Sequence, residues 1–138
     1  MTDSDLLQWE FIEQTNLDEF ILKMLSLGFP LETSIVGAFE KSGRGSRRDI
    51  DLPLHRDGDY SIDYKGKIDI VGLYCIKGGE AVTLIESHDY KTSFKLKAGQ
   101  ALIFDNKLCQ HGRVGSVGDR ILLRVWISKS LSSRSSAG

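Results

Sequence analysis

The spacing of hydrophobic positions in this chain changes near residue 34. From there to residue 128, short apolar runs alternate with Gly, Asp, Asn and Lys, a pattern typical of short β-strands joined by turns. Eight such runs occupy residues 34–41, 52–58, 68–77, 81–87, 92–97, 100–106, 109–114 and 120–128. Strands with such short connections predict a mainly β fold, in which two antiparallel sheets enclose one core as a jelly roll.

Before residue 34 the spacing is helical. Apolar side chains recur at three- and four-residue intervals, namely at Leu17, Phe20, Ile21, Met24 and Leu25. Asn16 and Glu19 stand at the positions of a capping box, and Gly28 is a stop signal. We therefore expect one helix over residues 16–29 that covers a sheet. A weaker alternation over residues 6–13 favours an edge strand.

Composition and charge exclude several classes of partner. The chain of 138 residues is long enough for one domain, to which we assign residues 1–128, and the Ser-rich tail 129–138 is expected to be disordered. Its 18 basic and 19 acidic residues give a net charge of -1, which offers no general attraction to nucleic acid or to an anionic membrane. No apolar run has the length of a membrane span, and the N-terminus begins acidic, where a secretory signal would begin basic. We expect a cytoplasmic protein.

The last predicted strand carries charge on one of its two faces. Side chains of one parity share a face of a strand, so residues 121, 123, 125 and 127 form a wholly apolar face. The opposite face carries Arg120, Leu122, Arg124 and Trp126. A guanidinium does not lose its proton in a protein, and burying it without a partner is costly. The two arginines therefore predict bound anions.

Candidate metal ligands lie on two of the predicted strands. His55 and Asp57 are two residues apart in the strand over 52–58, hence on one face of it. This spacing alone is weak evidence, because a chain with 19 acidic residues often produces it by chance. His111 lies on the strand over 109–114, which in a jelly roll can return beside the strand of His55. Two imidazoles and one carboxylate would form the facial triad of a non-haem ferrous oxygenase, with three coordination positions left open.

The arginines of the last strand suit the cosubstrate of such a site. A 2-oxo diacid would chelate the iron and leave a position for dioxygen, and its far carboxylate would need a cation at the pocket wall. Arg120 offers a planar bidentate fork for that carboxylate. Arg124 lies about 13 Å further along the same face in Cα terms, too far to share one small anion, and so predicts a second one. Trp126 is assigned with Arg124 to the substrate site, although aromatic residues in strands are more often core.

Ordinary structural roles compete with these assignments. An ion pair would satisfy either arginine, and the acidic residues available are Asp119 and Asp105 for the first, and Asp69 and Glu80 for the second. For the triad, the alternative is a surface histidine with an acidic neighbour and an unrelated core histidine.

The same residues resemble a known family. The elements HRD, KGGEAVTLIES, FDNKLCQHGR and GDRILLRVWI are similar to the iron(II)/2-oxoglutarate-dependent oxygenases, and most like their taurine dioxygenase and clavaminate synthase branch. The resemblance spans residues 52–128 and implies the double-stranded β-helix form of the jelly roll, which is cupin-like. It also implies roles for five residues: iron ligation by His55, Asp57 and His111, binding of 2-oxoglutarate by Arg120, and contact with the primary substrate by Arg124.

The chain departs from that branch in two ways. The position after Gly79 and Glu80, often a threonine that contacts the cosubstrate, is Ala81, and Thr83 on the same face would replace it. The long insertion that covers the pocket in those relatives is missing, and a homodimer would supply such a cover. The short separation of the histidines is closer to compact oxygenases of the prolyl-hydroxylase type.

These observations predict an enzyme that uses iron(II), 2-oxoglutarate and dioxygen to hydroxylate a small polar or anionic substrate. Asp57 favours hydroxylation, because halogenating relatives have a small residue there. Two other functions stay open. One is an oxygenase that modifies a macromolecule, and the net charge disfavours nucleic acid as that macromolecule. The other is a cupin-like module that binds a metal or ligand without turnover.

Overall fold

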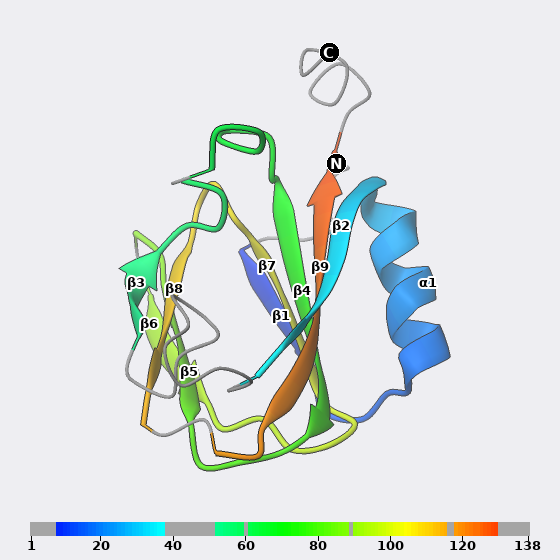
Figure 1. Ribbon diagram of the computed structural model, residues 1–138, viewed down its shortest axis with the longest axis vertical. Helices are drawn as coiled ribbons and strands as arrows, with labels where there is room; N and C mark the ends of the chain where they lie inside the picture. Colours follow the sequence, from blue (N-terminus) through cyan, green and yellow to red (C-terminus); the bar gives the residue numbers. More distant parts are fainter. Residues whose placement is uncertain (1–7, 38–51, 60, 89, 116–117, 130–138) are drawn as a thin grey trace.

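The computed structural model describes residues 8–37, 52–59, 61–88, 90–115 and 118–129. Within these residues the chain forms nine strands and one helix (Figure 1). The elements follow the order β1 (Trp9–Ile12), α1 (Leu17–Leu27), β2 (Phe29–Val36), β3 (Leu52–His55), β4 (Ile70–Lys77), β5 (Val82–Glu86), β6 (Lys91–Phe94), β7 (Ala101–Asp105), β8 (Gln110–Val114) and β9 (Ile121–Ser128). The predicted mainly β fold is confirmed, and the additional strand is β1, the weakly predicted edge strand.

Two antiparallel sheets face one another as a jelly roll. The larger sheet has the strand order β1-β7-β4-β9-β2, and the smaller one has the order β3-β8-β5-β6. In Figure 1 the smaller sheet and α1 lie on opposite sides of the larger sheet. A hydrophobic core that includes Val71 and Phe104 of the larger sheet and Ile85 of the smaller one fills much of the space between the sheets. This is the double-stranded β-helix arrangement that the sequence predicts.

The helix covers the outer face of the larger sheet, as expected. The side-chain oxygen of Asn16 caps it by accepting a hydrogen bond from the backbone N–H of Glu19 at 2.9 Å. Phe20 and Met24 are fully buried in a second core beneath the helix. A Cβ at Gly72 of β4 would come within 2.9 Å of Cζ of Phe20, so glycine there leaves room for the helix side chains against the sheet.

The two faces of β9 separate as their alternation predicts. Leu123, Val125 and Ile127 pack in the core beneath α1. Trp126 belongs to the core between the sheets, and Arg124 lines a pocket on the same inner face. One strand thus contributes to both cores and to the pocket.

The strand after the helix begins earlier than predicted. β2 starts at Phe29, immediately after the helix, whereas the pattern predicts a strand from Ser34. Gly28 permits this sharp return, because a Cβ there would lie within 2.8 Å of Cγ2 of Ile127. Pro30 is accommodated because β2 is an edge strand of the larger sheet.

Several predictions extend beyond the described residues. Residues 38–41 of the first predicted strand and residues 130–138 of the predicted tail lie outside them. Of that tail, Lys129 is described, and its backbone N–H donates to Oδ2 of Asp69 at 2.7 Å. In the described part of the chain, α1 has 11 residues, and no helix there is long and apolar enough to cross a membrane.

Replacing Met24 with alanine should lower the free energy of unfolding by about 2–4 kcal/mol, because it empties a fully buried position between α1 and the sheet. Leu22→Ala on the same helix is the matched control. The side chain of Leu22 is exposed, so the expected change is within about 0.5 kcal/mol. Urea unfolding followed by circular dichroism measures both, and equal effects would contradict the packing of α1 described above.

Candidate metal centre and cosubstrate pocket

The pairing of β3 with β8 brings two histidines together. The register places His55 directly opposite His111, and their ring centroids are 4.3 Å apart. The predicted return of the His111 strand beside the His55 strand is therefore confirmed. The register of β3 shifts between Leu52 and His55, and a Cβ at Gly112 would lie within 2.6 Å of the backbone oxygen of Leu52. Glycine at position 112 permits the close strand contact that aligns the histidines.

The carboxylate comes from a turn, and here the predicted strand was too long. β3 ends at His55, and Asp57 lies in the following turn, before Gly58 with its φ of 85°. Asn106 holds this turn through two hydrogen bonds. Its side-chain oxygen accepts from the N–H of Asp57 at 3.0 Å, and its amide nitrogen donates to the carbonyl of Asp57 at 2.9 Å. The position of Asp57 thus depends on Asn106 and not on strand alternation.

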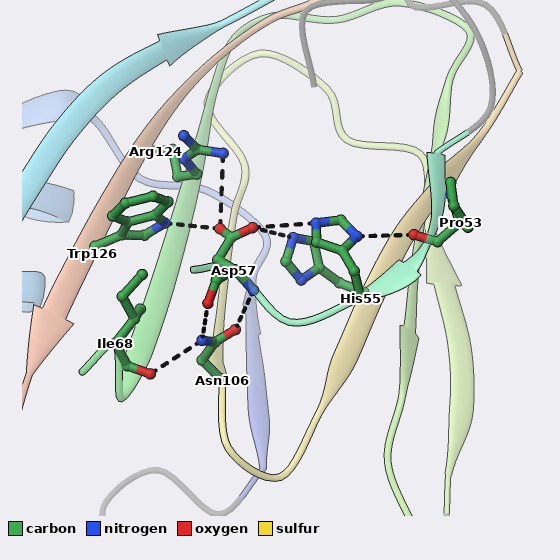
Figure 2. Close-up of polar contacts among 8 residues, drawn as sticks. Pro53, His55, Asp57, Ile68, Asn106, Arg124 and Trp126 are labelled. Atoms are coloured by element: carbon green, nitrogen blue, oxygen red, sulfur yellow. Dashed lines mark hydrogen bonds and ion pairs between the residues drawn. The ribbon is translucent and has the colours of Figure 1, made fainter. Parts of the chain in front are cut away.

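The donor atoms of the three candidate ligands lie close together, and Figure 2 shows two of these residues, His55 and Asp57. Oδ1 of Asp57 lies 3.2 Å from Nε2 of His55 and 3.3 Å from Nε2 of His111. The carbonyl of Pro53 lies 2.9 Å from Nδ1 of His55. It accepts a hydrogen bond from Nδ1, which leaves a lone pair on Nε2 for a metal. Within the described residues, this is the one group of His, Cys, Asp and Glu that converges closely enough to hold a metal ion.

Electrostatics favour the metal-binding forms of two of these side chains at neutral pH. Burial opposes ionisation of Asp57, but His111, His55 and Arg124 around it hold the pKa of its carboxyl well below the usual value. Burial lowers the pKa of His111, so its imidazole is neutral at pH 7. Burial also acts to lower the pKa of His55, but hydrogen bonds to Asp57 and Pro53 outweigh it and raise that pKa. His55 is therefore the ligand at which a metal competes most with a proton.

The donor set fits a divalent transition metal. Cis donors that each lie about 2.1 Å from a metal stand about 3 Å apart, close to the 3.2 and 3.3 Å found between Oδ1 of Asp57 and the two imidazole nitrogens. The ring of His111 lies 4.8 Å from that of Phe104, and its Nδ1 is buried without a hydrogen-bond partner in the described part of the chain. Packing, and not a second hydrogen bond, therefore orients His111.

A pocket lies beside the triad and is lined in part by Arg120, Thr83 and Arg113. Arg120 is buried, and its Nη1 donates to Oγ1 of Thr83 at 3.0 Å. Burial, followed by the like charge of Arg113, lowers the pKa of Arg120 to about 10, so the guanidinium remains charged at pH 7. Arg113 lies two residues after His111 on β8 and opposite Thr83 of β5. This end of the pocket is suited to a carboxylate.

Arg124 lies between this pocket and the carboxylate of Asp57. Its Nη1 is 3.8 Å from Oδ2 of Asp57, and its guanidinium lies 4.6 Å from the ring centroid of Trp126. Its Nε is buried and has no hydrogen-bond partner among the described residues. The indole Nε1 of Trp126 donates to Oδ2 of Asp57 at 2.8 Å. The structure therefore places Trp126 against the aspartate, and its assignment to the substrate site stays a prediction.

The acidic residues that would have neutralised the two arginines pair with lysines instead. The pairs are Asp119 with Lys77 at 3.8 Å, Asp105 with Lys129 at 3.6 Å, Asp69 with Lys107 at 3.2 Å and Glu80 with Lys95 at 2.6 Å. Among the described residues, the predicted alternative ion pairs of Arg120 and Arg124 do not form.

Comparison with known proteins gives a clear result at the level of the fold. No protein-family model matches the sequence, and no curated protein matches it. A Pseudomonas putida prolyl-4-hydroxylase has a TM-score of 0.54 at 13% identity, over 87% of this chain and 72% of that one. An oxidoreductase of the 2OG-Fe(II) oxygenase family from Burkholderia pseudomallei has a TM-score of 0.52 at 11% identity, over 74% of this chain. This chain shares its fold with these two solved structures.

The likeness shows the fold and nothing finer at these identities. The chain spans 44% of the length of the Burkholderia protein, so the activity of that whole protein does not transfer. The solved structures also leave the taurine dioxygenase and clavaminate synthase branch untested, and that resemblance stays a prediction.

The sequence patterns assigned no role to two residues of the site, Arg113 and Asn106. Arg113 follows His111 in an HGR element, and its position two residues after a candidate ligand was a signal that it shares the inner face of β8. Asn106 lies in the same FDNKLCQHGR element, but the resemblance assigned it no role. Its two hydrogen bonds to Asp57 join residues 49 positions apart, and no local pattern reports such contacts.

Proposed function

We propose that the protein is an iron(II)- and 2-oxoglutarate-dependent dioxygenase that hydroxylates a small polar or anionic substrate. The observation that carries this proposal is the convergence of two imidazole nitrogens and one carboxylate oxygen beside a pocket with a buried guanidinium at its wall. The fold shared with a 2OG-Fe(II) oxygenase supports it. A metal alone would suit many activities, and the buried positive charge is what favours a dicarboxylate cosubstrate.

Five of the candidate residues bind the iron and the cosubstrate in this proposal. His55, Asp57 and His111 hold the iron, and Arg120 binds the distal carboxylate of 2-oxoglutarate with Thr83 beside it. Bound iron(II) supplies adjacent open coordination positions for the 2-oxo acid and dioxygen. The reaction converts 2-oxoglutarate, dioxygen and a C–H bond into succinate, carbon dioxide and an alcohol. One oxygen atom of dioxygen enters succinate and the other enters the product.

Arg124 favours an anionic group on the primary substrate. It lines the pocket near the triad, and its long 3.8 Å contact with Asp57 leaves donors for a further acceptor. A substrate anion at this point would lie close to the iron and orient the carbon that is attacked.

The predicted cytoplasmic location accords with two buried free cysteines, which a reducing compartment maintains. The homodimer stays a prediction.

Titration of 2-oxoglutarate into the anaerobic iron(II) protein tests the proposal. Chelation by the 2-oxo acid should produce a weak, saturable visible charge-transfer band. Glutarate is the matched control ligand, because it has both carboxylates and no 2-oxo group to chelate through. A saturable band followed by release of succinate in air would support the oxygenase. Metal binding with no band for either ligand would overturn it and favour the cupin-like module.

A panel of small anions tests the substrate class once succinate release is established. We expect one of them to stimulate succinate formation and to gain a hydroxyl group. Stimulation by a protein or nucleic acid and by no small anion would favour the macromolecule-modifying alternative. Loss of that stimulation with rising salt would indicate a polyanion.

A further inference from the structure

The two carboxylate oxygens of Asp57 have different surroundings (Figure 2). Oδ1 faces Nε2 of His55 at 3.2 Å and Nε2 of His111 at 3.3 Å. Oδ2 faces the opposite way, where it accepts the indole N–H of Trp126 at 2.8 Å and lies 3.8 Å from Nη1 of Arg124. One oxygen is thus available to a metal, and the other is engaged by β9.

The backbone of Asp57 is held by Asn106, independently of Trp126. Asn106 binds both the N–H and the carbonyl of Asp57, and its amide nitrogen also reaches the carbonyl of Ile68 at 3.1 Å. Asn106 is itself buried. The remaining freedom of Asp57 lies in its side-chain torsions, so the hydrogen bond to Trp126 sets the direction of the carboxylate and turns one oxygen toward the histidines.

The ring of Trp126 is held firmly enough to set that direction. It is 9% exposed, Tyr64 packs edge-on against it at 5.2 Å, and the guanidinium of Arg124 lies 4.6 Å from its centroid. Trp126 does not contribute to the lining of the pocket in the described part of the chain. The polar contribution of Trp126 at this site is therefore the hydrogen bond that its indole N–H donates to Asp57.

We propose that Trp126 is a positioning residue for the metal centre. Its N–H engages Oδ2 of Asp57, so that Oδ1 alone is directed at the point where the two imidazole nitrogens converge. The inference rests on the proposed function, because it requires a metal at that point. Without the N–H, Oδ2 keeps only the 3.8 Å contact with Arg124 among its described partners, which is too long for a hydrogen bond. The carboxylate can then turn and present both oxygens or neither.

Trp126→Phe tests this inference, because it keeps an aromatic ring and removes the N–H. We expect the affinity for cobalt(II), used as a spectroscopic substitute for iron(II), to fall by about 10- to 100-fold. The cobalt(II) d–d absorption of the fully loaded protein should also change in intensity, because that intensity depends on coordination number. A general loss of stability would weaken the protein without altering this spectrum.

Trp9→Phe is the matched control variant. Trp9 is the other tryptophan of the chain, and it packs edge-on against Phe94 at 5.2 Å, the same ring geometry that Tyr64 and Trp126 adopt. It has no hydrogen bond to a candidate ligand in the described structure, so cobalt(II) binding by Trp9→Phe should equal that of the wild type. If Trp126→Phe fails to fold, 3-benzothienylalanine at position 126 decides the question, because sulfur replaces the N–H in a ring of nearly the same shape.

The outcomes separate this inference from the proposed function. The positioning role would be overturned if loss of the N–H left the cobalt(II) affinity within twofold of the wild-type value and the intensity of the d–d absorption unchanged. A raised KM for the primary substrate with unchanged metal affinity would also overturn it, and would support the assignment of Trp126 to the substrate site. A wild-type protein that binds no divalent metal would instead remove the metal centre, and with it the proposed function.

Discussion

Replacing His111 with alanine should abolish stoichiometric binding of iron(II) and all 2-oxoglutarate turnover. His111 contributes one of the two imidazole nitrogens that face Oδ1 of Asp57, and a facial triad that loses a ligand keeps too few donors for firm binding. Asp57→Ala should have an equal effect, since it removes the carboxylate at the centre of the cluster. We expect at least a 100-fold loss of metal affinity in both variants, measured by anaerobic titration.

His88→Ala is the matched control for this prediction. His88 is the third histidine of the chain and is exposed between β5 and β6, so its removal should leave metal binding unchanged. Circular dichroism should show that the fold persists in all three variants, because none of the replaced residues belongs to either hydrophobic core. Full coupled activity in His111→Ala or Asp57→Ala would remove the triad from the mechanism.

Replacing Arg120 with alanine should raise the apparent KM for 2-oxoglutarate by about 10- to 150-fold. This range corresponds to the loss of a charge-assisted contact of about 1.5–3 kcal/mol. Arg120 is buried and charged, and its neighbour Thr83 contributes no neutralising charge, so the anion is expected to come from the cosubstrate. Arg120→Lys should restore affinity only in part, because an ammonium does not reproduce the bidentate fork.

Arg124→Ala should differ from Arg120→Ala in the kind of loss. It should bind 2-oxoglutarate near its normal affinity and still release succinate slowly, while hydroxylated product disappears because the substrate is no longer oriented. Separate measurement of succinate and product distinguishes the two arginines. The reverse pattern would exchange their roles. No change in either quantity, in either variant, would show that both arginines are structural.

The sequence alone determined the framework of this protein. The alternation of apolar residues predicted the strands and the two faces of β9, and the capping box of Asn16 and Glu19 predicted the start of α1. These predictions succeed because each depends on side chains a few residues apart, whose relative directions follow from local backbone geometry. Strand alternation grouped His55 with Asp57, and the expected jelly roll brought the strand of His111 beside that of His55.

Only the tertiary structure decided how the site is assembled. Asp57 lies in a turn, where strand periodicity no longer applies, and its orientation depends on Asn106 and Trp126, which are 49 and 69 positions away. Thr83 and Arg120 meet across 37 positions. Contacts of this kind are set by strand register and sheet order, which many distant residues determine together. A local pattern therefore reveals which residues face the interior, and the packing of the two sheets decides which of them meet.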